Sequence, residues 1–132
     1  MKRFVVLLAI NCLLLFSAGA QALLGYTAQQ IRDKYPTAHP KAPGETTLSV
    51  FLSHGKVSFY FNASTGRCYH CTQVPYSDDE RRRQIEEYTP AHGYVIVSPT
   101  EWTISINGAT MYIKLKKSER SNFNYFDYGR QP

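Results

Sequence analysis

The chain has 132 residues and a formal net charge of +5, which suits one domain with one modest core and only a mild basic bias. Its basic residues are scattered apart from Arg81–Arg83 and the group Lys114, Lys116 and Lys117. The sequence therefore lacks the strong cationic cluster typical of nucleic-acid binding. After residue 22 it contains no stretch apolar enough to cross a membrane.

The first 22 residues predict a secretory signal peptide. Lys2 and Arg3 form a positive start, an apolar run covers residues 4–16, and Ala-Gln-Ala at 20–22 fits the small-residue rule for cleavage. The apolar run is shorter than the ~20 residues of a membrane-spanning helix, and an uncleaved anchor is the alternative. Cleavage leaves residues 23–132 as a single secreted or periplasmic domain without stable membrane insertion.

A short helix and three strands are predicted in the first half of this domain. Thr27 and Gln30 match a capping box, so a helix is expected from Thr27 to Tyr35, where Pro36 ends it. Alternating apolar and polar residues then predict strands over 47–53, 56–62 and 67–74, separated by turns at His54-Gly55 and Ser64-Thr65-Gly66.

The second half repeats this order. Ser77 and Glu80 match another capping box, and a helix is expected from there to Pro90. Alternation in the segment that begins at Trp102 predicts that this side chain points into the core. Strands are predicted over residues 94–97, 102–106, 111–116 and 122–128, with a hairpin turn at Asn107-Gly108.

The two halves match each other at an interval of about 54 residues. The segment Ile31–His39 aligns with Ile85–His92 after one gap, and His54-Gly55 precedes Asn107-Gly108 by 53 residues. We therefore expect an α+β fold in which two short helices pack on one face of an antiparallel meander sheet, with an internal duplication of an α-βββ unit. The other face of the sheet would be partly open. The half-repeats would cover residues 26–75 and 76–128.

This order of elements resembles the β-lactamase-inhibitor-protein fold and the PepSY-like exported proteins over residues 26–128, with Ile31–His39 and Ile85–His92 as the repeat marks. The resemblance implies a non-catalytic binding or inhibitory role, although fold analogy alone does not establish a function. It carries over no site residues, because no signature motif is present.

An aromatic surface is the first candidate for a binding site. Tyr60 and Tyr112 alternate with apolar core positions in two predicted strands, so both side chains are expected on the open face of the sheet. Tyr69 and Tyr125 are expected to join them. Exposed tyrosines are typical of binding surfaces, but tyrosines paired across strands also simply stabilise a sheet.

The motif Cys68-Tyr69-His70-Cys71 is the second candidate. Thioredoxin-like redox chemistry would need the first cysteine at a helix start, and a metal site would need a further ligand such as His54 or His92. Strand alternation puts Cys68 and His70 on one face and Cys71 on the other. In a regular strand the two Cα atoms would be ~10 Å apart, too far for a disulfide without a bend. Two unpaired thiols, at least one of them buried, are therefore expected, with a disulfide in a bent chain as the alternative.

No constellation in the sequence indicates catalysis. The acidic run Asp78, Asp79 and Glu80 is explained by the start of a helix, and neither a Gly-x-Ser-x-Gly elbow nor a phosphate-binding loop occurs. The leading hypothesis is an exported, non-enzymatic binding module without a cofactor, whose partner is a protein, a peptide or an envelope component. The alternatives are a small thiol or metal-binding protein that uses Cys68, His70 and Cys71, and an enzyme of unrecognised type.

Overall fold

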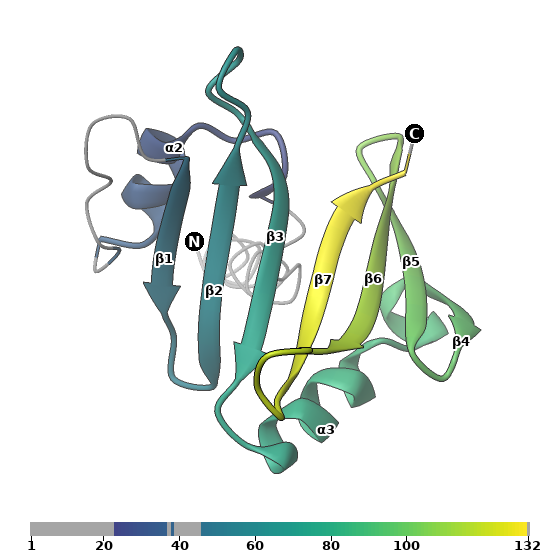
Figure 1. Ribbon diagram of the computed structural model, residues 1–132. Coiled ribbons are helices and arrows are strands. Elements are labelled where there is room, and N and C mark those ends of the chain that lie inside the picture. The colour runs from purple at the N-terminus through teal and green to yellow at the C-terminus, as the bar shows by residue number, and fades with distance from the viewer. Residues whose placement is uncertain (1–22, 37, 39–45, 132) are drawn as a thin grey trace, which may run out of the picture.

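The computed structural model describes residues 23–36, 38 and 46–131 (Figure 1). The expected signal peptide at 1–22 and most of the Pro-rich connection before the first strand lie outside these residues. The helices are α2 (Ala28–Lys34), α3 (Asp78–Glu87) and the short 3-10 helix η2 (Pro90–His92). The strands are β1 (Thr47–Phe51), β2 (Gly55–Phe61), β3 (Cys68–Pro75), β4 (Tyr94–Ser98), β5 (Glu101–Ile106), β6 (Ala109–Lys117) and β7 (Asn124–Arg130).

The strands form one seven-stranded antiparallel sheet in the order β1-β2-β3-β7-β6-β5-β4. The α+β class and the antiparallel sheet are therefore confirmed. Two meanders, β1–β3 and β4–β7, meet at the central pair of β3 and β7, which Figure 1 shows in the middle of the sheet. This junction brings residues 70–73 beside residues 126–129, with Cys71 opposite Tyr128.

Each α-helix begins one residue after the capping residue that the sequence predicts. Thr27 accepts a hydrogen bond from the Gln30 amide at 3.2 Å, and the Gln30 side chain accepts the Thr27 amide at 2.9 Å, which completes the predicted capping box. Ser77 caps α3 by accepting the Glu80 amide at 3.2 Å. The Glu80 carboxylate instead pairs with Arg83, so the predicted box at α3 is formed from one side only.

The core joins one side of the sheet with Ile31 of α2 and with Tyr88, the residue that follows α3. Ile31 of α2 is fully buried together with alternate strand residues of the same cluster: Leu48, Val50, Val57, Phe59, Ile113, Phe126 and Tyr128. Trp102 is buried, as its alternation predicts. Among the residues that the structure describes, no helix has the length and apolar character needed to cross a membrane.

A buried polar network attaches α3 to the sheet. No residue inside α3 is buried, but Tyr88 directly after it lies in the core and shares a hydrogen bond of 2.7 Å with the Tyr128 hydroxyl. Gln84 donates to the Tyr88 hydroxyl at 2.9 Å, and Gln73 of β3 accepts from the Tyr128 hydroxyl at 3.0 Å. Because these buried groups satisfy each other, they add specificity without leaving a polar atom unpaired.

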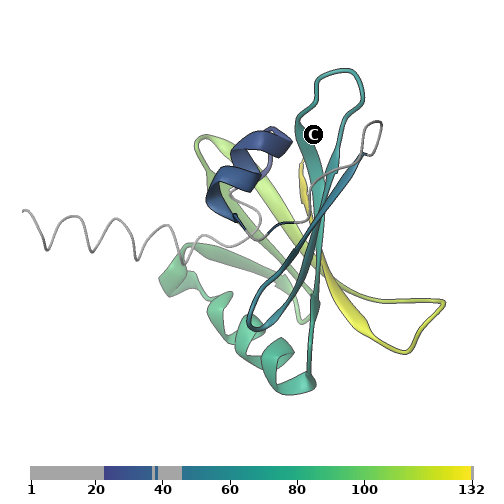
Figure 2. The ribbon, with the colours of Figure 1, turned by 90° about the vertical axis from the view of Figure 1, so that its left-hand side faces the viewer.

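Figures 1 and 2 show α2 and α3 on the same side of the sheet. In the part of the chain that the structure describes, no helix lies over the opposite side of the sheet. We refer to that side as the outer face. It includes Tyr60 of β2, His70 of β3, Asp127 of β7 and Tyr112 of β6, which alternate with buried positions in their strands.

Candidate functional site

A β-bulge decides where the Cys68–Cys71 motif points. Tyr60 of β2 lies opposite His70, but the next residue, Phe61, lies opposite Cys68, so Tyr69 is an extra residue in β3. The bulge turns both Cys68 and Cys71 toward the core, where they are 3% and 0% exposed, and leaves His70 on the outer face. The prediction that Cys68 and His70 share one face is therefore wrong, because strict alternation does not hold across a bulge.

The two thiols are free and buried. Burial raises the pKa of Cys68 to about 11 and that of Cys71 well above its usual value. Both groups are therefore protonated at neutral pH, whereas nucleophilic and metal-binding cysteines act as thiolates. Since His70 points away from them, the three residues do not converge on one point. No group of three or more metal-ligating side chains gathers within the described part of the chain.

The outer face is organised around Asp127. This residue is only 5% exposed, and its carboxylate oxygens are bonded by the His70 ring nitrogen Nε2 and by the Lys116 ammonium, the latter at 2.7 Å. Burial alone raises the pKa of Asp127, but the bonds from His70 and Lys116 outweigh it and lower the pKa below its ordinary value. Asp127 is therefore ionised at neutral pH and holds side chains from β3 and β6 in fixed positions.

Three of the four predicted tyrosines surround this cluster. The Tyr60 and Tyr69 rings lie 5.2 and 6.1 Å from the His70 ring. Tyr112 lies opposite Gly129, and its ring occupies the space that a side chain at Gly129 would need. Tyr60, His70, Gly129 and Tyr112 thus form one continuous row across four neighbouring strands.

Tyr125, the fourth predicted tyrosine, lies beside the row. It is two residues from Asp127 in β7 and opposite Lys116 in β6, so it shares the outer face without joining the Tyr60–Tyr112 row. The Lys114 ammonium lies 4.9 Å from the centre of the Tyr112 ring, a cation–π contact that adds positive charge to the same surface.

Sequence reasoning missed Asp127, Lys116 and Gly129 as members of the site. The signal available for Asp127 is an acidic residue inside the aromatic run Tyr125–Tyr128, at a position predicted to be in a strand. Its partner His70 is 57 residues away in the sequence. The pairing therefore depends on β3 lying next to β7, which alternation within each strand does not predict.

The His70–Asp127 pair can be compared with the His–Asp pairs of catalytic sites. A His–Asp bond orients the imidazole in many hydrolases, but there a nucleophilic hydroxyl or thiol is hydrogen-bonded to the same ring. In the described part of the chain, the only hydrogen bond to the His70 ring comes from Asp127. Comparisons with protein-family models, with curated proteins and with solved structures found no match to this chain.

Proposed function

We propose that this chain is an exported, non-enzymatic binding module that recognises a protein or peptide through the outer face of its sheet. The observation that carries the proposal is the row of Tyr60, His70 and Tyr112 across the strands β2, β3, β7 and β6. Tyrosine rings supply large, amphipathic contact area at a low cost in conformational entropy. A row of them on a side of the sheet without a helix suits the recognition of another chain.

The Asp127 cluster supports this function by holding the row rigid. His70 and Lys116 are tied to the same carboxylate, and Tyr60 and Tyr69 pack against the His70 ring. Side chains that are already ordered lose little entropy when they bind a partner. The surface is thus preorganised, and its rings are flanked by hydrogen-bonding and charged groups that select the partner's orientation.

The first 22 residues support a proposed export of the protein, since they carry a positive start, an apolar run and an Ala-Gln-Ala cleavage pattern. We therefore place the module in the periplasm or outside the cell, where an envelope component is the alternative partner. Edman sequencing or mass spectrometry of the exported protein tests this, since an N-terminus at Leu23 supports it and a retained Met1 contradicts it.

An internal duplication accounts for the two meanders and is part of the proposal. Core positions of the two halves correspond at an interval of 54 residues, with matching pairing between strands: Leu48 and Trp102, Val50 and Ile104, Val57 and Met111, Phe59 and Ile113, Phe61 and Leu115. Ile31 and Ile85 correspond in the helices at the same interval. An experimental structure in which residues 48–61 superpose on 102–115 supports the duplication, and a different offset contradicts it.

The duplication also bears on the inhibitory role that the resemblance implies. Repeated helix-and-meander units combine into one broad sheet, and a broad sheet offers a larger contact surface than either half. In this chain the row crosses the junction of the halves at β3 and β7. The proposed surface therefore exists only when both halves are present.

Binding measured with surface variants tests the proposed function. Wild-type protein is used to capture a partner from envelope extract, and the affinity of the purified pair is then compared with that of the double variant Tyr60→Ala/Tyr112→Ala. Tyr76→Ala is the matched control, because Tyr76 is 54% exposed in the turn between β3 and α3. We expect the double variant to bind at least ~10-fold more weakly and the control to bind like the wild type. Unchanged binding by a folded double variant would contradict the surface assignment.

A further inference from the structure

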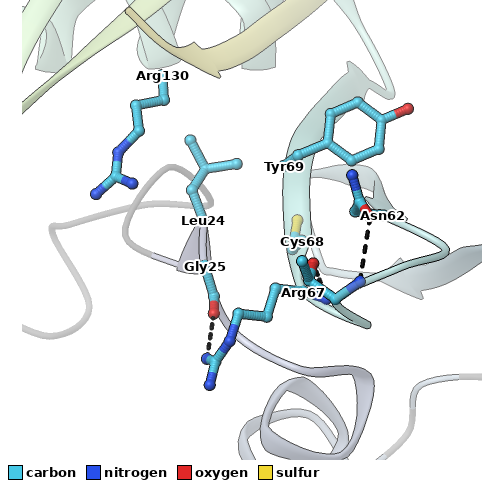
Figure 3. A pocket seen from close by; sticks show the side chains of 8 residues that line it. Leu24, Gly25, Asn62, Arg67, Cys68, Tyr69 and Arg130 are labelled. Carbon is cyan, nitrogen blue, oxygen red and sulfur yellow. Dashed lines mark hydrogen bonds between the residues drawn. The ribbon is translucent and has the colours of Figure 1, made fainter. Parts of the chain in front are cut away.

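A pocket that shares Tyr69 with the cluster on the outer face opens at one end of the central strands. It lies between the turn at Leu24 and Gly25, the loop that connects β2 to β3, and Arg130 at the end of β7, and it has a volume of about 240 Å³. Figure 3 shows Arg130 and Tyr69 on opposite sides of Leu24, with Arg67 close to Gly25. The volume is below the ~300–1,000 Å³ typical of sites for drug-sized ligands, so the pocket suits a small group or the end of a chain.

Three hydrogen-bond acceptors of the pocket wall are already occupied. The Asn62 side-chain oxygen accepts the backbone amides of Ser64 and Thr65 at 2.8 and 3.2 Å. The Gly25 carbonyl accepts from the Arg67 guanidinium at 2.9 Å, and the Cys68 carbonyl accepts the Gly25 amide at 2.7 Å. A ligand that donates hydrogen bonds would therefore find few free partners in this wall.

Hydrogen-bond donors remain available in the same wall. Arg67 uses one guanidinium nitrogen for Gly25, and Arg130 makes no side-chain hydrogen bond or ion pair with the described residues. The Asn62 side-chain oxygen accepts a hydrogen bond in the turn, and the side-chain nitrogen of Asn62 remains available as a donor. Among the residues that the structure describes, no aspartate or glutamate lines the pocket, and the Cys68 thiol is protonated because burial raises its pKa to about 11. Donors without a competing anion define a site for a negative group.

The side of the pocket formed by Tyr69 and Leu24 is apolar. The Tyr69 side chain is 59% exposed, because the bulge in β3 turns it out of the regular alternation. A planar guanidinium matches the geometry of carboxylate and phosphate oxygens, and the neighbouring ring offers contact area to an attached apolar group. We infer that this pocket binds a carboxylate or phosphate group that carries an apolar substituent, with Arg130 holding the anion, Tyr69 contacting the substituent, and Arg67 bordering the pocket through its bond to the Gly25 carbonyl.

Titration with three small probes tests this inference without a protein partner. The result therefore does not depend on whether the outer face binds a protein or peptide. Phenylacetate and phenyl phosphate carry the two anions, and phenylacetamide is the neutral counterpart. Calorimetry gives the affinities, and amide shifts in nitrogen–proton spectra locate the site. We expect saturable binding of at least one anion, shifts at Gly25, Cys68 and Tyr69, and at least ~10-fold weaker binding of the amide. The anion that binds more tightly identifies the group that the pocket prefers.

Arginine variants assign the binding to the pocket. Arg130→Gln is the main variant, because the Arg130 guanidinium makes no hydrogen bond or ion pair with the residues that the structure describes, and Arg67→Gln is the second. Arg120→Gln in the exposed β6–β7 loop is the matched control. We expect Arg130→Gln to weaken binding about 10-fold and Arg120→Gln to leave it unchanged. Equal affinity for anion and amide, shifts confined to the row of Tyr60, His70 and Tyr112, no saturable binding of either anion, or the same affinity in Arg130→Gln and Arg120→Gln would each overturn the inference.

Discussion

Replacing Gly129 by alanine tests the packing of the row on the outer face. A Cβ atom at Gly129 would lie 2.2, 2.4 and 2.7 Å from the Oη, Cζ and Cε1 atoms of Tyr112, whereas carbon atoms in contact are separated by ~3.5–4.0 Å. The Tyr112 ring therefore has to move by more than ~1 Å, and overpacking of this kind costs about 1–3 kcal/mol. We expect Gly129→Ala to lower the free energy of unfolding by that amount.

When the Tyr112 ring is absent, Gly129→Ala should raise the free energy of unfolding instead of lowering it. In a Tyr112→Ala background the new methyl group meets no ring, and alanine restricts the unfolded chain more than glycine does. Such a change stabilises a protein by about 0.4–1 kcal/mol where the backbone accepts it. Urea unfolding of the wild type, both single variants and the double variant, followed by circular dichroism, measures the coupling energy, which we expect to be about 1.4–4 kcal/mol. An equal effect of Gly129→Ala in both backgrounds would refute the placement of Tyr112 over Gly129.

Further predictions concern the core network, the buried carboxylate and the thiols. Tyr128→Phe removes the hydroxyl that the buried Gln73 oxygen accepts, and we expect a loss of about 1–3 kcal/mol in urea unfolding; unchanged stability would contradict the network. Because the pKa of Asp127 is lowered in the folded state, its contribution to stability is present above the unfolded value of ~3.9 and is lost as the pH falls through the folded value. The free energy of unfolding of Asp127→Asn should therefore fall less than that of the wild type between about pH 5 and pH 2. An equal dependence on pH in both proteins would argue against a lowered pKa of Asp127. Cys68 and Cys71, which are buried with raised pKa values, should react slowly with a thiol reagent at neutral pH until urea unfolds the protein, and rapid native labelling would contradict their burial.

Local patterns predicted the elements of the fold because each depends on residues close in sequence. The capping box at Thr27 predicted α2, and the alternation around Trp102 predicted β5. Strand ends were less exact. β1 ends at Phe51 instead of residue 53, and β7 runs from Asn124 to Arg130 instead of 122–128, because the end of a strand depends on how far its neighbour continues to pair.

The parts of the site that sequence reasoning missed depend on contacts between distant segments. The bulge at Tyr69 arises from the register between β2 and β3 and interrupts the alternation of β3, and residues within β3 alone do not determine where that interruption falls. The order of the sheet places β7 next to β3, so Asp127 reaches His70 only in the folded chain. The tyrosines Tyr60 and Tyr112 were predictable because a single strand decides which face each of them occupies.

Photo-crosslinking from the outer face tests the central claim most directly. A photoreactive phenylalanine analogue replaces Tyr60 in one protein and Tyr76 in another, and each is irradiated in cells that export it. Both positions accept an aromatic side chain, but Tyr60 lies in the row beside His70, whereas Tyr76 lies exposed between β3 and α3. The account predicts a specific crosslinked partner from position 60 and none from position 76. Crosslinks from position 76 alone, or the same adducts from both positions, would contradict a binding function of the outer face.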